Sequence, residues 1–166
     1  MTKEMVKLLA NWFTLGNVKK APGTIGTLGA IPLYLIINSL RNFISNEKLY
    51  NSLYFLFLIA FFIFSVYICD RAEKEIYKKK DPQVVVIDEV LGFMTTMFLV
   101  NPHGIFQTIV AIVLGFVLFR IFDITKIGYI NTAQNLKDGV GVVADDFLAG
   151  IVANIILIII SGLLWG

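Results

Sequence analysis

Two pairs of adjacent carboxylates interrupt a chain that is otherwise strongly apolar. Asp88 and Glu89 lie near the start of the apolar run 84–100, and Asp145 and Asp146 come just before the last apolar run. By the 1.5 Å rise of a helix, the first pair lies only about 7 Å from the start of its run. A carboxylate there costs several kcal/mol unless it is paired or binds a metal, so we interpret this pair as functional.

Basic residues that suit a phosphate group accompany these acids. Arg120, Asp123 and Lys126 follow one another at helical spacing at the end of the fourth apolar run, and Lys20 precedes the first run. The planar guanidinium of an arginine matches the oxygens of a phosphate, whereas a lysine supplies a compact positive charge. The sequence therefore offers both kinds of phosphate-binding cation.

The turn into the first apolar run offers another way to hold an anion. Gly23 and Thr24 follow a proline at the start of this run. Backbone N–H groups at a helix N-terminus point toward a bound anion. Gly23, Gly26 and Gly29 also recur at a spacing that suits close helix packing through small residues, so both interpretations stay open.

Oxygen-rich side chains of this kind favour a hard divalent cation. Mg²⁺ prefers carboxylate oxygens and water, and the candidate ligands are Asp88, Glu89, Asp123, Asp145 and Asp146. The chain has one cysteine and one histidine, so a structural zinc site is not expected. We interpret His103 as a turn residue without a catalytic role.

Most of these groups also have a purely structural interpretation. Asp145 and Asp146 could cap a helix and complement its dipole. The charges of segment 120–126 could form local ion pairs at a helix end. The charge-dense segment 70–81 is typical of a solvated amphipathic helix. Such explanations fit Asp88 and its neighbour least well, because they lie inside an apolar run.

The composition places all of these groups in a membrane protein. Of the 166 residues, 57% are hydrophobic and 16% are charged, whereas a soluble domain carries about 25% charged residues. Five apolar runs cover residues 24–40, 50–69, 84–100, 104–122 and 147–165. About 20 residues are needed to cross the hydrocarbon core, so the first and third runs are short for spans.

We therefore expect one all-α domain over residues 1–166. It would be a polytopic membrane helical bundle with about five membrane-embedded helices and a short N-terminal helix. A net charge of +2 and the lack of a basic nucleic-acid motif argue against nucleic acid as a partner. The oligomeric state is not indicated.

The basic residues predict which side each loop occupies. If the five runs alternate, all of the 14 lysines and arginines except Arg41 and Lys48 fall on one side, which should be cytoplasmic. Of the 12 acids, only Glu47 falls on the other side. The starts of the first, third and fifth runs and the end of the fourth then meet at the cytoplasmic face. This topology requires that 84–100 crosses rather than re-enters.

At these residues the chain resembles the phosphatidylglycerophosphatase A family. The similar stretches are 21–32 (APGTIGTLGAIP), 86–92 (VIDEVLG), 119–126 (FRIFDITK) and 137–150 (KDGVGVVADDFLAG), in the order of the family. Two departures occur: Ile127 follows Lys126 where the family often has proline, and Asp138 precedes Gly139 where it often has glycine.

The resemblance implies a Mg²⁺-dependent bacterial enzyme of the cytoplasmic membrane. It would remove the terminal phosphate from phosphatidylglycerophosphate to give phosphatidylglycerol, with this substrate and membrane lipids as its partners. An active site at the cytoplasmic face would let the acyl chains stay in lipid.

On this reading each charged group has a role. Mg²⁺ would be held by Asp88, Glu89, Asp145 and Asp146. Asp123 would be a further ligand or would orient Arg120. The substrate phosphate would contact Lys20, Gly23, Thr24, Arg120 and Lys126. Asp88, Glu89, Asp123, Arg120 and Lys126 form the catalytic set. Attack by water and transient phosphorylation of an aspartate both remain open.

Three other classes of protein compete with this reading. A cation transporter or channel subunit would use the acids as an ion path, but the second and fifth runs carry no charged group at mid-bilayer. A lipid-headgroup transferase would carry an Asp-Gly-x₂-Ala-Arg signature, which is absent after Asp138. A purely structural protein leaves the acids at 88 and 89 unexplained.

Overall fold

The computed structural model describes residues 1–126 and 139–165, and these residues form helices and loops. The longer helices are α1 (Lys3–Ala10), α2 (Pro22–Ser39), α3 (Glu47–Arg71), α4 (Ile87–Thr96), α5 (Gly104–Thr125) and α7 (Gly139–Trp165). Short helical segments are η1 (Leu15–Asn17), η2 (Leu40–Asn42) and η3 (Ala72–Tyr77). The predicted all-α bundle with a short N-terminal helix is confirmed. Ile127, Lys137 and Asp138 lie outside the described residues.

Within residues 1–126 and 139–165, four helical segments are long and apolar enough to cross a membrane. They are Pro22–Asn42, Glu47–Tyr77, Gly104–Thr125 and Gly139–Trp165. Large apolar side chains on their outer faces, such as those of Ile63 and Ile155, are more than half exposed. Outward-facing apolar side chains on helices of this length suit a lipid environment. The protein is therefore a helical membrane protein.

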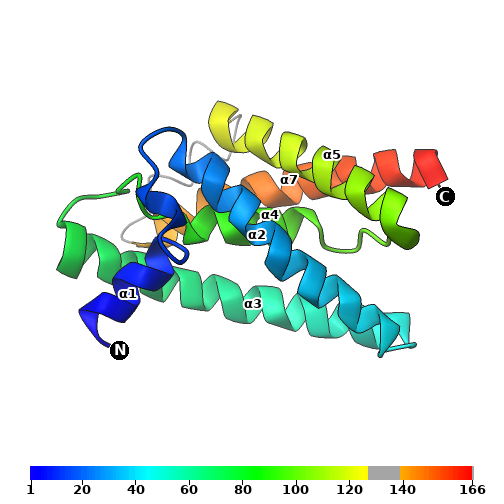
Figure 1. Cartoon of the computed structure of the whole chain (residues 1–166), viewed down its shortest axis with the longest axis horizontal. Coiled ribbons are helices and arrows are strands. Elements are labelled where there is room, and N and C mark those ends of the chain that lie inside the picture. The colour runs from blue at the N-terminus through cyan, green and yellow to red at the C-terminus, as the bar shows by residue number, and fades with distance from the viewer. Residues whose placement is uncertain (127–138, 166) are drawn as a thin grey trace.

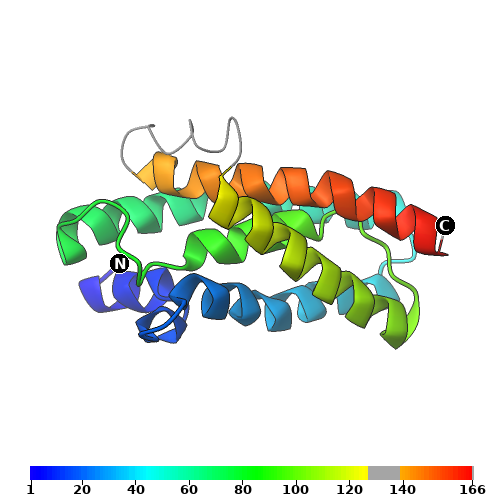
Figure 2. The same cartoon turned by 90° about the horizontal axis from the view of Figure 1, so that it is seen from above.

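The third apolar run forms a helix much shorter than a membrane span. Helix α4 has ten residues, of which all but Glu89 are buried. It lies inside the bundle between α2, α3, α5 and α7 (Figures 1 and 2). After Met97 the chain continues without helix to the start of α5, at the other end of the bundle (Figure 1). Residues 84–100 thus connect the two ends of the bundle, as the predicted alternation of the spans requires. They do so as a half-length helix followed by an irregular segment.

Side chains of neighbouring helices satisfy the carbonyl end of α4. The Asn154 side chain on α7 donates to the carbonyl of Thr96 at 2.8 Å and to that of Phe98. From α3, the Tyr54 hydroxyl donates to the carbonyl of Met94 at 2.9 Å. Unpaired carbonyls in an apolar environment cost several kcal/mol each, so these bonds let a helix end inside the bundle.

Close contact between α4 and α7 places the two helices against each other. A Cβ atom on Gly150 would lie 2.4 Å from the carbonyl oxygen of Gly92. A Cβ atom on Gly92 would lie 2.4 Å from the ring of Phe119 on α5. Elsewhere, Gly26 packs on Val86 in the same way. Small residues therefore set the helix spacing.

The segment 70–81 differs from the predicted solvated amphipathic helix. Helix α3 passes into the π-helical η3, which ends at Lys78 in a left-handed conformation with φ of 50°. Glu73 is buried, and its carboxylate accepts a hydrogen bond of 2.6 Å from the backbone N–H of Asp81. The chain therefore turns back to the bundle, where the N–H of Val86 donates to the carbonyl of Ala10 at 2.9 Å.

The helix ends that carry the predicted site lie together. The starts of α2, α4 and α7 and the end of α5 lie toward the same end of the bundle, where α1 also lies (Figures 1 and 2). The opposite end holds the turn from α2 into α3, the start of α5 and the C-terminal end of α7. The predicted convergence of the charged segments is confirmed.

We expect Gly150→Ala to destabilise the bundle. The added methyl would meet the backbone of α4, which has no side chain that can move aside, so a loss of about 1–3 kcal/mol is expected. Gly162→Ala on the same helix is the control, because a Cβ there meets nothing within 4 Å. Thermal unfolding of both variants in one detergent, followed by circular dichroism, measures the difference. Equal melting temperatures would contradict the close contact.

Candidate active site

A cavity of about 400 Å³ lies among the converging helix ends. Its walls come from the segments before α2 and α4, from the first turns of these helices, from the end of α5 and from α7. The lining residues are Lys19, Ala21, Pro22, Gly23, Asp81, Gln83, Val85, Asp88, Glu89, Arg120, Asp123, Ile124, Lys126, Val142, Asp145 and Asp146. Nine of these are charged, and they come from segments far apart in the chain.

Three carboxylates form a cluster in this cavity. Asp88, Glu89 and Asp146 each offer one oxygen, and these oxygens lie within 4.8 Å of one another. Asp88 and Glu89 occupy the first turn of α4, where the positive end of the helix dipole favours negative charge. Asp146 comes from α7, and its backbone carbonyl lies 2.9 Å from where a Cβ on Gly92 would be. The contact between α4 and α7 therefore brings the third acid to the first two.

The cluster leaves one buried carboxylate oxygen without a hydrogen-bond partner. Asp88 and Asp146 are 5% and 4% exposed, and Oε2 of Glu89 is buried with no hydrogen bond. The Glu89 backbone N–H donates to Oδ1 of Asp88 at 3.2 Å. Three carboxylates held this close repel one another unless a cation or protons lie between them. An all-oxygen donor set of this kind fits a hard divalent cation such as Mg²⁺.

Arg120 and Asp123 form an ion pair on the last turns of α5. Their side chains are only 16% and 10% exposed. Nε of Arg120 is buried without a partner, so the guanidinium keeps a hydrogen-bond donor for another group. A Cβ on Gly23 would lie 2.2 Å from Oε1 of Glu89 and 3.1 Å from Nη1 of Arg120. Gly23 is therefore where the acidic cluster and the guanidinium come together.

Lys126 pairs with an acid on another helix, not with Asp123 as the local interpretation assumed. Its ammonium donates to Oδ2 of Asp145 on α7 at 2.5 Å. Lys126 ends α5 in a left-handed conformation, with φ of 46°, which is uncommon for a lysine. Burial lowers the pKa of Lys126, but the hydrogen bond and charge of Asp145, with Asp146 and Asp123 nearby, outweigh burial and raise it. The lysine therefore stays charged.

The position of Asp145 and Asp146 excludes the interpretation that they cap a helix. Helix α7 already includes Gly139, six residues before Asp145. Asp145 is held by Lys126 and lies beside the cluster of three acids, with its Oδ1 buried and unpaired. Both acids are thus buried inside a helix, where their charge needs a partner.

Two of the predicted phosphate contacts do not line the cavity. Lys20 is exposed and Thr24 is half-buried, and neither belongs to its walls. Lys19 lines it in place of Lys20. The sequence reasoning also missed Asp81 and Gln83. The signal that could have identified them is their position just before the run 84–100, on the side of the membrane where the sequence predicts the other charges.

Buried carboxylates beside a guanidinium and an ammonium, at one end of a membrane bundle, define a membrane protein with a site whose charges suit a phosphate group and a divalent cation. The chain belongs to the phosphatidylglycerophosphatase A family, which it matches over residues 8–161. Enzymes of this family are phosphoric monoester hydrolases, and so is this protein.

Curated relatives extend over nearly the whole chain. Phosphatidylglycerophosphatase A of Escherichia coli is 32% identical over 155 residues, covering 93% of this chain and 82% of that protein. The enzyme of the same name from Haemophilus influenzae is 32% identical over 159 residues, covering 94% and 88%. A Bacteroides thetaiotaomicron protein, whose name marks it as a candidate phosphatidylinositol-3-phosphatase, is 31% identical over 150 residues, covering 90% and 89%. No solved structure matches the chain.

We expect Lys126 and Asp145 to be energetically coupled. A double-mutant cycle with Lys126→Met and Asp145→Asn, measured by unfolding in detergent, should give a coupling energy of about 1–3 kcal/mol, because the pair is largely buried. The more exposed pair between Arg71 and Glu75 is the control and should give a smaller coupling energy. Additive effects of the two substitutions at 126 and 145 would show that the pair does not form.

Proposed function

We propose that this enzyme hydrolyses the terminal phosphate of phosphatidylglycerophosphate to give phosphatidylglycerol, with Mg²⁺ as cofactor. The observation that carries the proposal is the cavity in which three clustered carboxylates meet Arg120 and Lys126 at one end of a membrane bundle. In the reaction, an oxygen nucleophile attacks phosphorus, the phosphorus–oxygen bond to the glycerol breaks, and the released glycerol oxygen takes up a proton.

The clustered acids are the proposed metal site. Asp88, Glu89 and Asp146 would hold Mg²⁺, since their oxygens lie close together and one of them has no other partner. Bound there, the ion would supply positive charge that polarises the phosphate and lowers the pKa of water. Of the four predicted ligands, Asp145 differs from the rest, because it already accepts a hydrogen bond from Lys126.

The cations of the cavity would bind the phosphate and stabilise the charge that develops on its oxygens. The guanidinium of Arg120 has further N–H groups besides the one it gives to Asp123, and Asp123 keeps the guanidinium in place. The Lys126 ammonium has further N–H groups besides the one it gives to Asp145, and Lys19 lies on the same wall. Donors fixed before the reaction stabilise the transition state most effectively.

The same cavity would face the cytoplasm. At its end of the bundle the exposed lysines include Lys19, Lys20, Lys78, Lys79 and Lys80. The opposite end carries Arg41 and Lys48. Positive charge favours the cytoplasmic side of a membrane, so this distribution supports that orientation. A site at headgroup depth would leave the acyl chains beside the outward-facing apolar helices.

We expect the purified protein in detergent to release inorganic phosphate from phosphatidylglycerophosphate when Mg²⁺ is present and to stop when EDTA is added. In sealed vesicles, a short-chain water-soluble substrate should be hydrolysed from outside only when the membrane is inside-out. Phosphatidylinositol 3-phosphate serves as the competing substrate. No release in detergent would overturn the proposed reaction, whereas hydrolysis by right-side-out vesicles would overturn only the orientation.

Faster release from phosphatidylinositol 3-phosphate would change the proposed substrate. That result would support a phosphatidylinositol-3-phosphatase activity for this chain, as the name of the Bacteroides relative suggests. A thermal unfolding curve is measured on a portion of each preparation before the assay. Cooperative unfolding shows that any inactivity is not caused by misfolding.

Two substitutions should separate metal binding from phosphate binding. Asp88→Asn should weaken Mn²⁺ binding, measured by electron paramagnetic resonance, and should also lower hydrolysis. Arg120→Ala should keep Mn²⁺ binding but lower hydrolysis at least a hundredfold, as expected for the loss of one transition-state contact of about 3 kcal/mol. Glu4→Gln, an exposed acid on α1, is the control. Unchanged Mn²⁺ binding by Asp88→Asn would contradict the metal site.

A further inference from the structure

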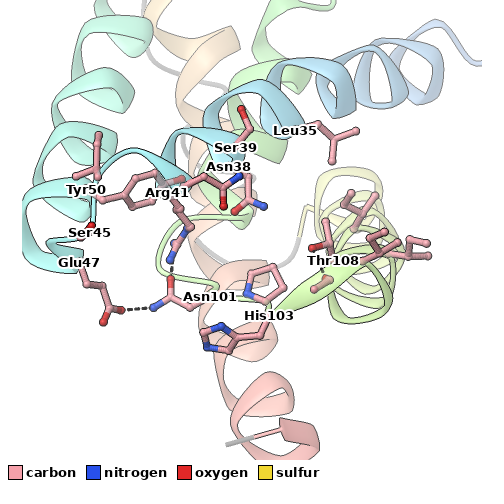
Figure 3. A pocket seen from close by; sticks show the side chains of 17 residues that line it. Leu35, Asn38, Ser39, Arg41, Ser45, Glu47, Tyr50, Asn101, His103 and Thr108 are labelled. Atoms are coloured by element: carbon pink, nitrogen blue, oxygen red, sulfur yellow. Dashed lines mark hydrogen bonds between the residues drawn. The ribbon is translucent and has the colours of Figure 1, made fainter.

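A second cavity, of about 810 Å³, lies at the end of the bundle opposite to the acidic cluster. It is lined by the end of α2 with η2, the segment that follows η2, the start of α3, the segment before α5 and the first turns of α5. Figure 3 shows polar side chains converging on it from all of these elements, with Arg41 near the centre. None of its lining residues belongs to the first cavity.

Arg41 is the strongest anion-binding group in this second cavity. Its guanidinium donates to the side-chain oxygen of Asn101 and, at 3.5 Å, to the carbonyl of Val100. The guanidinium also lies 4.1 Å above the ring of Tyr50. Its Nε is buried without a hydrogen bond, and in the described part of the chain Arg41 forms no ion pair. Neutral partners fix the orientation of this cation but leave its charge uncompensated.

Among the described residues, Glu47 is the one acid that lines this cavity, and it does not neutralise Arg41. Glu47 is exposed, and its carboxylate accepts a hydrogen bond from the amide of Asn101 (Figure 3). Asn101 thus lies between the two charges and contacts both. A partly buried guanidinium that is oriented in advance and lacks an anion is the arrangement that binds phosphate oxygens well.

A hydrogen-bond acceptor completes the polar part of the cavity. Oδ1 of Asn38 is buried without a partner, and Figure 3 shows Asn38 close to Arg41. A ligand that carries both phosphate oxygens and a hydroxyl group would therefore complement the guanidinium of Arg41 and the side-chain amide of Asn38. A glycerol-type phosphodiester headgroup has this chemistry.

Apolar residues on α2 and α5 continue the cavity along the bundle. Leu35, Ile105 and Ile109 line it and are 44%, 81% and 56% exposed. Helices α2 and α5 separate toward this end, as Figure 1 shows. Inorganic phosphate would make no favourable contact with these apolar side chains, whereas an acyl chain would pack against them.

We propose that this cavity binds an anionic phospholipid of the bilayer leaflet opposite to the active site. The phosphodiester would accept hydrogen bonds from Arg41, a headgroup hydroxyl would donate to Asn38, and an acyl chain would lie along Leu35 and Ile109. The inference does not depend on the proposed reaction, because the two cavities share no residue and binding is measured without turnover.

The test uses the delipidated full-length protein in detergent with EDTA present. Native mass spectrometry counts bound lipid during titration with dioleoyl phosphatidylglycerol or with dioleoyl phosphatidylcholine, which has the same chains and phosphodiester but no hydroxyl or net charge. We expect phosphatidylglycerol to bind more tightly, and Arg41→Met to weaken one of its sites about tenfold, as for the loss of a charged hydrogen bond. Lys48→Met, at the same end but outside the cavity, should bind as the wild type does.

Three binding results would overturn the proposal. Equal binding of the two lipids, or an unchanged site in Arg41→Met, would show that Arg41 does not select an anionic headgroup. Displacement of phosphatidylglycerol by millimolar inorganic phosphate would show a site for free phosphate instead. If Arg41→Met does not fold, Asn38→Asp decides the question. This variant keeps the Arg41 side chain, and its added carboxylate should repel the lipid phosphate and compete with it for the guanidinium. Unchanged binding of phosphatidylglycerol by Asn38→Asp would overturn the proposal.

Discussion

One constraint shapes the rest of this structure: helix α4 begins and ends inside a membrane bundle, and its backbone polar groups need hydrogen-bond partners there. Helix α4 is too short to reach both faces of a bilayer, so its carbonyl end lies among apolar side chains. Asn154 and Tyr54 supply the missing hydrogen bonds from two different helices. Because these bonds fix α4 along its axis, they also fix the depth of the two carboxylates in its first turn.

The contact between α4 and α7 connects this packing with the chemistry. Gly92 and Gly150 allow the two backbones to approach, and the same approach brings Asp146 to the acids of α4. The metal-binding candidates are therefore positioned by helix packing and not by mobile loops. Rigid elements hold ligands more precisely than loops do, which suits a site whose negative charges repel one another.

Two ion pairs accompany the three clustered acids. Arg120 pairs with Asp123 and Lys126 pairs with Asp145, and all of these groups line the same cavity. Each pair restrains a cation without using all of its donors, which leaves N–H groups for a phosphate. At the other end of the bundle Arg41 is restrained by neutral groups alone. An arginine is thus held by a carboxylate at the acidic end of the bundle, where Arg120 pairs with Asp123. At the other end, amide oxygens and an aromatic ring hold Arg41.

The sequence by itself determined the class of the protein and the end of the bundle where its site lies. Hydropathy runs and their alternation are properties of the chain in order, so they predicted a helical membrane bundle with Asp88, Arg120 and Asp146 at one end. Only the tertiary structure decided that α4 is a half-length helix, that Lys126 pairs with Asp145, and that Lys19 rather than its neighbour faces the cavity. These features depend on the rotation of each helix about its axis and on contacts between segments far apart in the chain, which spacing along one chain does not specify.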